Sequence, residues 1–452
     1  MFHFRSLTSA FLVLTTCAPH SGVKIEGPLI SGGIRYQEVQ RSLGANFNPW
    51  WRGFSDATLS NEINSALSGN LAQQQLGSRI QQASASLRAE GAALFPQIDL
   101  DTSASLDQID PGVSNQSASL GGLISWEVDL WSRVRSGVRA REQELNATIQ
   151  EWLGGRLMLS AAVAETRFLV LEQRARLDVL QQQIETNETL LGLVRLRAGQ
   201  GVSSRVDLLQ QERQLDATRA LVPPAEAELI ASSYALDVLT GRPPGKTTRD
   251  SRKTLPNLPA LPTTGVPSDL LKNRPDLLAK WNGILALDAE VAQALAERMP
   301  RIILSASLDA GTIDNIRSVA SAILAEATAP LADGGRRRAE IERRRAVLEE
   351  ALLDYSNSYL EAIRDVETAL VRERKQRERI HLTERQLSTA RETLEETRIR
   401  YSQGLTDYLP VIDALNAVQS LELSMVTFRR QALTLRIALH RALGGPMPQA
   451  QP

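Results

Sequence analysis

The chain has 452 residues, a formal net charge of -1 and only 4% aromatic residues. Such a balanced charge gives no basic field for nucleic acid or for an anionic lipid surface. The low aromatic content suits long helices with alanine and leucine seams better than a thick globular core. The only cysteine is Cys17, so a disulfide within one chain is impossible.

The first residues have the pattern of an export signal. Arg5 provides a positive start, and a short apolar run ends at Leu14. Leu14-Thr-Thr-Cys17 follows, and we expect cleavage before Cys17 and acylation of its thiol by palmitate, although Thr16 stands where a smaller residue is usual. The alternative is an incidental or buried thiol. Residues 1–16 are therefore assigned to a signal peptide and 17–49 to an extended, lipidated arm.

A helix is predicted after Pro49-Trp50-Trp51. Ser55 or Asp56 can cap it. Apolar residues recur on one face, and the helical pattern continues to about Ala93; the face comprises Leu59, Ile63, Ala66 and Leu67. No run of 18 apolar residues follows the signal, which argues against a membrane-spanning helix.

Beyond Phe95-Pro96 the apolar period becomes two residues, which indicates strands. Two strands of about ten residues are predicted around a loop with Pro111-Gly112. A transmembrane barrel needs this alternation, and Trp126 and Trp131 near the strand end favour a membrane. We expect one face to meet lipid (Ile98, Leu100, Leu106, Leu120, Ile124) and the other water (Asp99, Asp101, Glu127). The alternative is an amphipathic hairpin in a soluble sandwich.

Arg133 to Arg197 contains no proline and carries a heptad seam of Leu177, Ile184 and Leu191. This predicts one helix of roughly 100 Å. A turn at Gly199-Gln-Gly201 and a second helical stretch from Ser203 to about Leu239 follow.

The same unit recurs 203 residues later, without gaps, from Arg133/Arg336 to Gly241/Gly444. Gly404 then marks the second turn. We infer an internal duplication. The predicted organisation is a first repeat at 50–241, a proline-rich linker at 242–267, a second repeat at 268–445 and a tail at 446–452. Helix is expected from Ser268 to about Arg298.

The second repeat predicts a strand near Ile302–Ala310 and, from its position in the repeat, another near Val319–Ala329. Four strands cannot close a barrel, and lipid tolerates no open sheet edge. If these strands lie in a membrane, several chains must therefore build one barrel.

A catalytic or metal-binding constellation is absent from the sequence. The four histidines have no metal-ligand spacing. The segment from Gly241 to Thr247 resembles a phosphate loop but is one residue short and contains two prolines. The Arg/Glu run from Arg372 to Arg398 is interpreted as a solvated helix face. No enzyme activity and no cofactor are expected.

Short motifs follow one another from about residue 45 to 445. They are Trp51-Arg-Gly-Phe54, Ser125-Trp-Glu-Val-Asp-Leu-Trp131, Leu221-Val-Pro-Pro224, Leu239-Thr-Gly-Arg-Pro243, Leu270-Leu-Lys-Asn-Arg-Pro-Asp-Leu277, and Arg400-Tyr-Ser-Gln-Gly404 with Leu409-Pro-Val-Ile-Asp-Ala414. In this order they resemble the TolC-like outer-membrane factor family, in particular its NodT-like efflux lipoprotein branch. Thr16 and short loops near Asp110 and Asp314 depart from the family pattern.

The resemblance implies an α+β membrane protein. Its homotrimer would complete one transmembrane β-barrel in the outer membrane, with four strands per chain, above a long periplasmic α-helical coiled-coil barrel. It implies a passive channel for drugs or other small molecules, associated with antibiotic resistance. The implied partners are a periplasmic adaptor (membrane fusion) protein, an inner-membrane pump of the resistance-nodulation-division type and outer-membrane lipid.

The resemblance also implies a constricted periplasmic end at the hairpin turns. The matching ring residues are Leu409 and Asp413. Tyr401 and Asp207 match residues that tie neighbouring hairpins through a phenol–carboxylate hydrogen bond. The alternative is that Leu409 is an ordinary seam residue and Asp413 a solvated one.

Two other functions are retained. A non-conducting periplasmic coiled-coil scaffold or adaptor would explain the helices but not two alternating hairpins at equivalent positions. A TolC-like channel for type I protein secretion would share the architecture but carry proteins. Channel conductance in a bilayer distinguishes the scaffold from either channel.

Overall fold

The computed structural model describes residues 49–109, 113–245, 254–262, 267–313 and 316–445. Cys17, the signal peptide, the arm and the tail lie outside these residues. The described chain divides into two compact units. One comprises 78–151 and 276–358, and the other comprises 49–77, 152–275 and 359–445.

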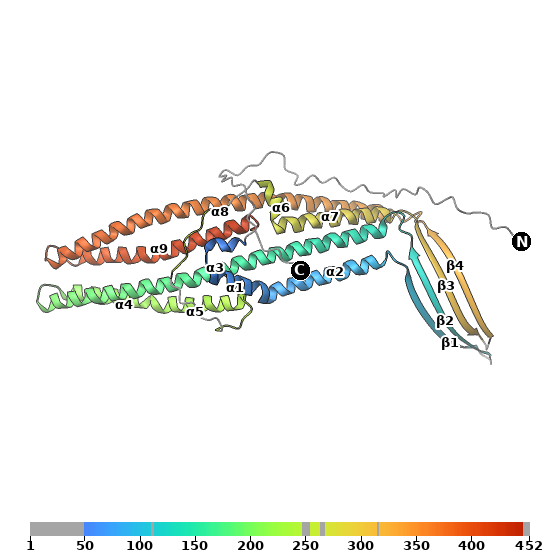
Figure 1. Cartoon of the computed structure of the whole chain (residues 1–452), viewed down its shortest axis with the longest axis horizontal. Coiled ribbons are helices and arrows are strands. Elements are labelled where there is room, and N and C mark those ends of the chain that lie inside the picture. Colours follow the sequence, from blue (N-terminus) through green and yellow to red (C-terminus); the bar gives the residue numbers. More distant parts are fainter. Residues whose placement is uncertain (1–48, 110–112, 246–253, 263–266, 314–315, 446–452) are drawn as a thin grey trace. The chain divides into compact units, whose positions relative to one another are not determined.

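The first unit contains a four-stranded antiparallel sheet in the order β1-β2-β3-β4 (Figure 1). The strands are β1 (Gln97–Ile109), β2 (Val113–Glu127), β3 (Arg301–Ile313) and β4 (Ile316–Thr328). All four predicted strands are confirmed, each longer than expected. The central pairing of β2 with β3 joins the hairpins of the two repeats, and β1 and β4 form the edges.

The pairing register gives the sheet one mainly apolar and one mainly polar face. Ile98 lies opposite Ile124, which lies opposite Ala306, which lies opposite Ile323. On the other face serine hydroxyls pair across strands, Ser103 with Ser119 at 2.8 Å and Ser105 with Ser117 at 2.9 Å. The apolar side chains are exposed in the single chain, so a partner of low polarity must cover them.

Strand β2 ends at Glu127, and only the backbone N–H of Val128 still donates to β3, to Ile302 O at 2.8 Å. The reason is Asp129, whose carboxylate accepts hydrogen bonds from the backbone N–H groups of Val134 (3.1 Å) and Arg135 (2.9 Å). Asp129 thereby satisfies free donors at the start of the next helix. Trp131, beside it, donates from its indole to Pro300 O at 2.8 Å.

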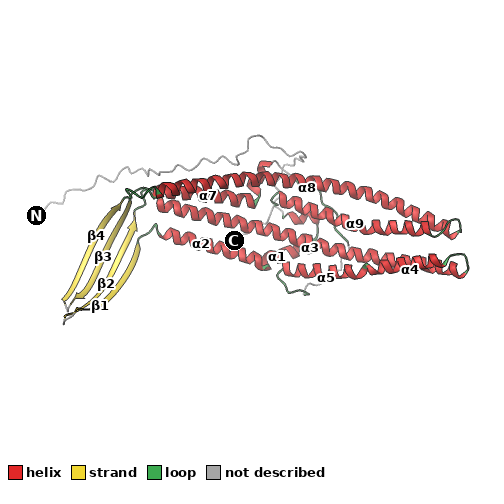
Figure 2. Cartoon of the chain, turned by 180° about the vertical axis from the view of Figure 1, so that it is seen from behind, coloured by secondary structure: helices red, strands yellow, loops and turns green. Residues whose placement is uncertain are grey.

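Two helices of equal length dominate the chain (Figure 2). They are α3 (Arg133–Gly199) and α8 (Arg336–Ser402), each of 67 residues. Each ends in a turn where a glycine, Gly201 or Gly404, has φ of 75°. This left-handed conformation is open to glycine without a Cβ penalty. The predicted long helix and the glycine turns are confirmed.

The shorter helices are more broken than predicted. The stretch after the first turn divides into α4 (Arg205–Ala220) and α5 (Val222–Leu239), because Pro223 and Pro224 cannot continue a helix interior. Its counterpart after the second turn is the single helix α9 (Leu409–Ala442). The other elements are the 3-10 turns η1 (Trp50–Phe54) and η2 (Pro267–Asp269), with α1 (Ala57–Gly69), α2 (Leu71–Ala92), α6 (Leu270–Asn273) and α7 (Pro275–Ala296).

Two of these breaks occur where a glycine backbone packs against another chain segment. A Cβ on Gly241 would lie 2.2 Å from Gly69 O at the end of α1. A Cβ on Gly444 would lie 2.5 Å from Asn273 O at the end of α6. Both breaks coincide with these close approaches, and at the second break Pro275 also disfavours a helical Arg274, so neither predicted continuous helix, to Ala93 or from Ser268 to Arg298, forms in one piece.

The core of the second unit surrounds Trp50 and Trp51, which pack with α1, α3, α5 and α9. Asp56 caps α1 by accepting from Thr58 N and Leu59 N, which confirms one of the two predicted caps. The same buried carboxylate pairs with Arg167 of α3 at 3.1 Å. A charge-assisted contact of this kind holds the start of α1 on the long helix.

The segment between the repeats is packed where the structure describes it. Leu255 and Leu258 contact the core, and the fully buried Arg436 donates from Nη1 to Pro259 O and Ala260 O, both at 2.5 Å. The other guanidinium nitrogens bind Glu373, with Nε at 2.8 Å. Interpreting residues 372–398 as wholly solvated is therefore wrong at Glu373, which is 1% exposed.

Candidate functional site at the hairpin turns

The ends of the two long hairpins are tied together by Arg197 near the end of α3. Its Nη1 donates to Tyr401 O at 2.8 Å and to Ser402 O at 3.0 Å. The guanidinium carbon also lies 4.5 Å from the centroid of the Tyr401 ring, a cation–π distance. One arginine thus fixes the end of α8 to the end of α3.

A hydroxyl relay crosses the same junction. The hydroxyls of Tyr401 and Ser203 lie 3.0 Å apart, and Ser203 donates to Asp207 Oδ2 at 2.8 Å. Asp207 also forms a capping box with Ser204 at the start of α4. The structure therefore brings Tyr401 and Asp207 to one site. Within this chain, however, Ser203 stands between them in place of the expected direct hydrogen bond.

Tyr401 of the relay also belongs to a small buried cluster. The cluster is formed by Val194, Tyr401, Tyr408, Val411 and Ile412. The two tyrosine rings are 5.4 Å apart and nearly edge to face. The hydroxyl of Tyr408 donates to Gln211 Oε1. Burial raises the pKa of Tyr408, and the nearby Tyr401 and Asp207 raise it further, so the phenol stays neutral and remains a donor.

The hydrogen-bond chain continues from Gln211 into α3. Gln211 Nε2 donates to Asn187 O at 2.8 Å, and Asn187 Nδ2 donates to Thr218 Oγ1 at 3.1 Å. Sequence reasoning missed these three residues and Tyr408. In the sequence these residues are marked only by being polar at positions where the helical period predicts burial. Buried polar side chains of this kind are normally hydrogen-bonded.

Leu409 and Asp413 point away from this cluster. Leu409 is 57% exposed, and Asp413 is also exposed one helical turn later, whereas Val411 and Ile412 between them are buried. Four residues of separation put both side chains on one face of α9. In the single chain this face carries an apolar group and a carboxylate that the hairpin pair does not cover.

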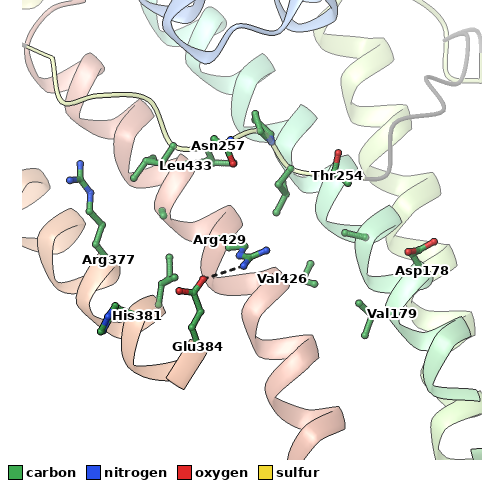
Figure 3. Close-up of a pocket in the computed structure, with 16 residues that line it drawn as sticks. Asp178, Val179, Thr254, Asn257, Arg377, His381, Glu384, Val426, Arg429 and Leu433 are labelled. Carbon is green, nitrogen blue, oxygen red and sulfur yellow. Dashed lines mark hydrogen bonds and ion pairs between the residues drawn. The ribbon is translucent and has the colours of Figure 1, made fainter. Parts of the chain in front are cut away.

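A groove of about 600 Å³ lies elsewhere in the second unit (Figure 3). Its walls come from α3, α8, α9 and the segment Thr254–Leu258. Arg429 of α9 reaches across the groove to Glu384 of α8 at 3.2 Å, so these two charges of the lining neutralise each other. Among the described residues, no group of three or more His, Cys, Asp or Glu could hold a metal ion. The described residues also contain no helix with the length and apolar character that a membrane span requires.

Comparison with known proteins identifies the architecture. The family model described as "Outer membrane efflux protein" matches residues 63–242 and 266–445. The pyoverdine export outer membrane protein OpmQ of Pseudomonas aeruginosa (strain PAO1) is 28% identical over 460 residues, 97% of this chain and 96% of that protein. Nodulation protein T of Rhizobium leguminosarum bv. viciae is 25% identical over 404 residues, 88% of this chain and 84% of that protein.

The solved structure of the outer-membrane channel OprN superposes with a TM-score of 0.86 at 26% identity, covering 94% of this chain and 98% of that one. The sheet with one apolar face, the two equal helical hairpins and the matched ranges are features of one protein class. The chain is a member of the outer membrane efflux protein family, an outer-membrane channel of the TolC-like fold that extends into the periplasm.

Proposed function

We propose that three copies of the chain form a passive channel and that the hairpin turns are its periplasmic gate. The observation that carries this function is the amphipathic sheet with two unpaired edges, β1 and β4. A four-stranded sheet cannot close on itself, and its edges need partners in lipid. Three copies pairing edge to edge would enclose the polar face and turn the apolar face to lipid.

Leu409 and Asp413 are the proposed gate residues. In a trimer, their exposed face of α9 would place three leucines and three carboxylates around one axis. Apolar rings resist wetting, and clustered carboxylates favour cations. The contacts of Arg197 and the relay through Ser203 would hold the hairpins in the closed arrangement.

The proposed cargo and partners rest on the chemistry of a wide channel and on the likeness to the relatives. A wide channel needs no specific pocket, and the name of OpmQ assigns export of pyoverdine to that relative. We extend small-molecule export, drugs included, to this chain in preference to protein secretion. A periplasmic adaptor would bias the gate by binding its open form better, and an inner-membrane pump of the resistance-nodulation-division type would supply the energy.

Reconstitution of the purified protein into a planar lipid bilayer tests the channel. We expect stepwise ion conductance with a preference for cations. A trimeric preparation that inserts into the bilayer without conducting would favour the scaffold alternative.

Substitution on the sheet tests which face meets lipid. Leu100→Arg should destabilise the inserted protein by about 2–4 kcal/mol if the residue is near the bilayer midplane, because lipid solvates the charge poorly. Ser103→Arg is the matched control, since Ser103 lies on the polar face opposite Ser119. Denaturant titration of protein in lipid vesicles gives both values, and equal tolerance of the two arginines would contradict a barrel.

The proposed lipid anchor at Cys17 has a direct test. We expect mass spectrometry of the mature protein to show an N-terminal Cys17 carrying acyl chains, because Leu14-Thr-Thr-Cys17 follows a short apolar run. Two acyl signals hold a protein on a membrane far more firmly than one. An unmodified thiol, or a mature chain that retains residues 1–16, would exclude the anchor.

A further inference from the structure

We propose that an exposed face at the beginning of α3 and α8, the arginine face, binds the headgroups of anionic phospholipids in the adjoining membrane leaflet. The face consists of six residues: Arg135, Arg139 and Glu142 of α3 with Arg338, Glu342 and Arg345 of α8. The inference rests on the membrane-inserted sheet of the proposed function. It adds the class of lipid that the helices next to that sheet would select.

The internal duplication shows that the arginine face is open in both repeats. Its three positions in each helix are spaced by four and three residues, which places them on one side of the helix. All six side chains are exposed. By contrast, Ala140 of α3 is buried, whereas its equivalent Arg343 of α8 is exposed. The packing that covers α3 therefore leaves the arginine face free.

The arginine face carries a local excess of positive charge. Arg338 pairs with Glu342 at 3.0 Å, but both side chains are largely exposed, so this pair contributes little stability. Arg135 lies 3.4 Å from the carboxylate of Asp129. Among the described residues, Arg139 and Arg345 form no ion pair. The chain's net charge of -1 conceals this local cluster of cations.

The arginine face follows the sheet in the order of layers found at a membrane surface. Trp126 lies on the mainly apolar face of the sheet, Phe95 precedes β1 and is 67% exposed, and Leu331 follows β4 and is 96% exposed. Arg135 and Arg338 come next along the chain. Both views draw the starts of α3 and α8 at the end of the sheet (Figures 1 and 2). Apolar, then aromatic, then basic side chains match the passage from hydrocarbon to headgroups.

The reach of the four arginines fits the thickness of the headgroup layer. At 1.5 Å per residue, Arg135 and Arg338 lie about 3 Å along their helices, Arg139 about 9 Å and Arg345 about 14 Å. The headgroup layer of one leaflet is roughly 5–8 Å thick. Long side chains of a helix extend toward its N-terminus, which is the direction of the sheet here. Arg345 therefore marks the far limit of the contact.

The donors for the headgroup come from side chains, because the helix starts are already satisfied. Asp129 accepts from the first turn of α3, and Asp333 accepts from Gly335 N at 3.1 Å and from Arg337 N at 3.2 Å at the start of α8. A guanidinium group offers two parallel N–H donors to a phosphate. A zwitterionic headgroup also brings a cation close to the arginines, whereas phosphatidylglycerol does not. The arginine face should therefore prefer lipids with a net negative charge.

Tryptophan quenching in lipid vesicles tests this preference. The protein is reconstituted in phosphatidylcholine with a small fraction of either brominated phosphatidylglycerol or brominated phosphatidylcholine. Trp126 and Trp131 precede the arginine face, so their quenching reports which lipid lies beside it. We expect the apparent affinity for phosphatidylglycerol to be higher on the order of fivefold. Arg139→Gln with Arg345→Gln should bring the ratio of the two affinities close to one.

Two sets of matched variants serve as controls. Glu142→Gln with Glu342→Gln removes the negative charges of the same face and should strengthen the preference. Arg391→Gln with Arg429→Gln removes exposed arginines of the second unit and should leave it unchanged. Concentrated sodium chloride should weaken the preference of the parent, because salt screens exposed charges. Circular dichroism and light scattering report helix content and assembly for each variant.

Three results would overturn the inference. The first is equal quenching by the two brominated lipids in the parent, or a preference that survives Arg139→Gln with Arg345→Gln. The second is displacement of brominated phosphatidylglycerol by inorganic phosphate beyond the effect of chloride at equal ionic strength, which would indicate a site for soluble anions. The third is a changed ion preference of the bilayer conductance in the arginine variant without a changed lipid preference, which would place these residues in the channel lumen. Absence of conductance with the lipid preference intact would instead overturn the proposed channel alone.

Discussion

Replacing Leu409 and Asp413 together with alanine is expected to raise the resting conductance of the channel on the order of tenfold. This corresponds to a shift of about 1.4 kcal/mol in the equilibrium between closed and open gates. Leu409→Ala removes the exposed apolar group that would resist wetting. Asp413→Ala removes the carboxylates that would attract cations, so the preference for cations should weaken as well. Single-channel recording in a planar bilayer measures both quantities.

The duplication provides a matched control for this experiment. Val206 and Gln210 of α4 occupy the positions 203 residues before Leu409 and Asp413. Val206 is exposed like Leu409. Val206→Ala with Gln210→Ala should leave the resting conductance near that of the parent. Equal opening by both double variants would show that the effect is not specific to α9, and a Leu409/Asp413 double variant that conducts like the parent would exclude these two positions as the gate.

Removing Arg436 is expected to have the largest effect on stability. Arg436→Ala leaves Glu373 buried without its main partner and frees the carbonyl groups of residues 259 and 260. Breaking a buried pair from one side costs about 3–5 kcal/mol. In the parent, His440 beside this pair is uncharged at neutral pH, because burial, assisted by Arg436, lowers its pKa to about 4. Thermal unfolding followed by circular dichroism measures the loss.

Two controls separate a buried charge from lost packing. Arg429→Ala, on the same helix, removes an exposed pair with Glu384 and should cost no more than about 1 kcal/mol. Arg436→Met with Glu373→Met should be less harmful than Arg436→Ala, because no unpaired carboxylate remains. If the double variant is the least stable, packing and the hydrogen bonds to residues 259 and 260 stabilise this region more than the charge pair does. The argument from the buried charge then fails.

The long helices and the strands could be predicted because their signals extend over many residues. The proline-free seam of α3 and the alternation in β1 depend only on the period of apolar residues. Strand β4 is alanine-rich and ambiguous alone, and the duplication made it predictable. The close approaches of Gly241 and Gly444 depend on segments distant in sequence, so no local pattern could indicate them.

At the candidate site, too, some residues could be predicted from the sequence and others could not. Asp207 and Tyr401 were expected to share a direct hydrogen bond at the turns, and the structure links them there through Ser203 instead. The intervening Ser203 and the partner of Tyr408, Gln211, depend on the side-chain register between two hairpins, which a period does not specify. Leu409 and Asp413 were named from the resemblance. Their outward direction follows from α9 packing on its other face, while their role as a gate remains a prediction.

The equal length of α3 and α8 also means that the long helices of the two hairpins span the same distance. Because Arg197 bonds to the last residues of α8, both hairpins must finish level with each other. In a threefold assembly the six hairpin ends would then form an even rim, to which an adaptor could seal without gaps. Seven added residues would lengthen one arm by roughly 10 Å. The span of such a conduit can therefore change only when both repeats gain or lose the same number of heptads.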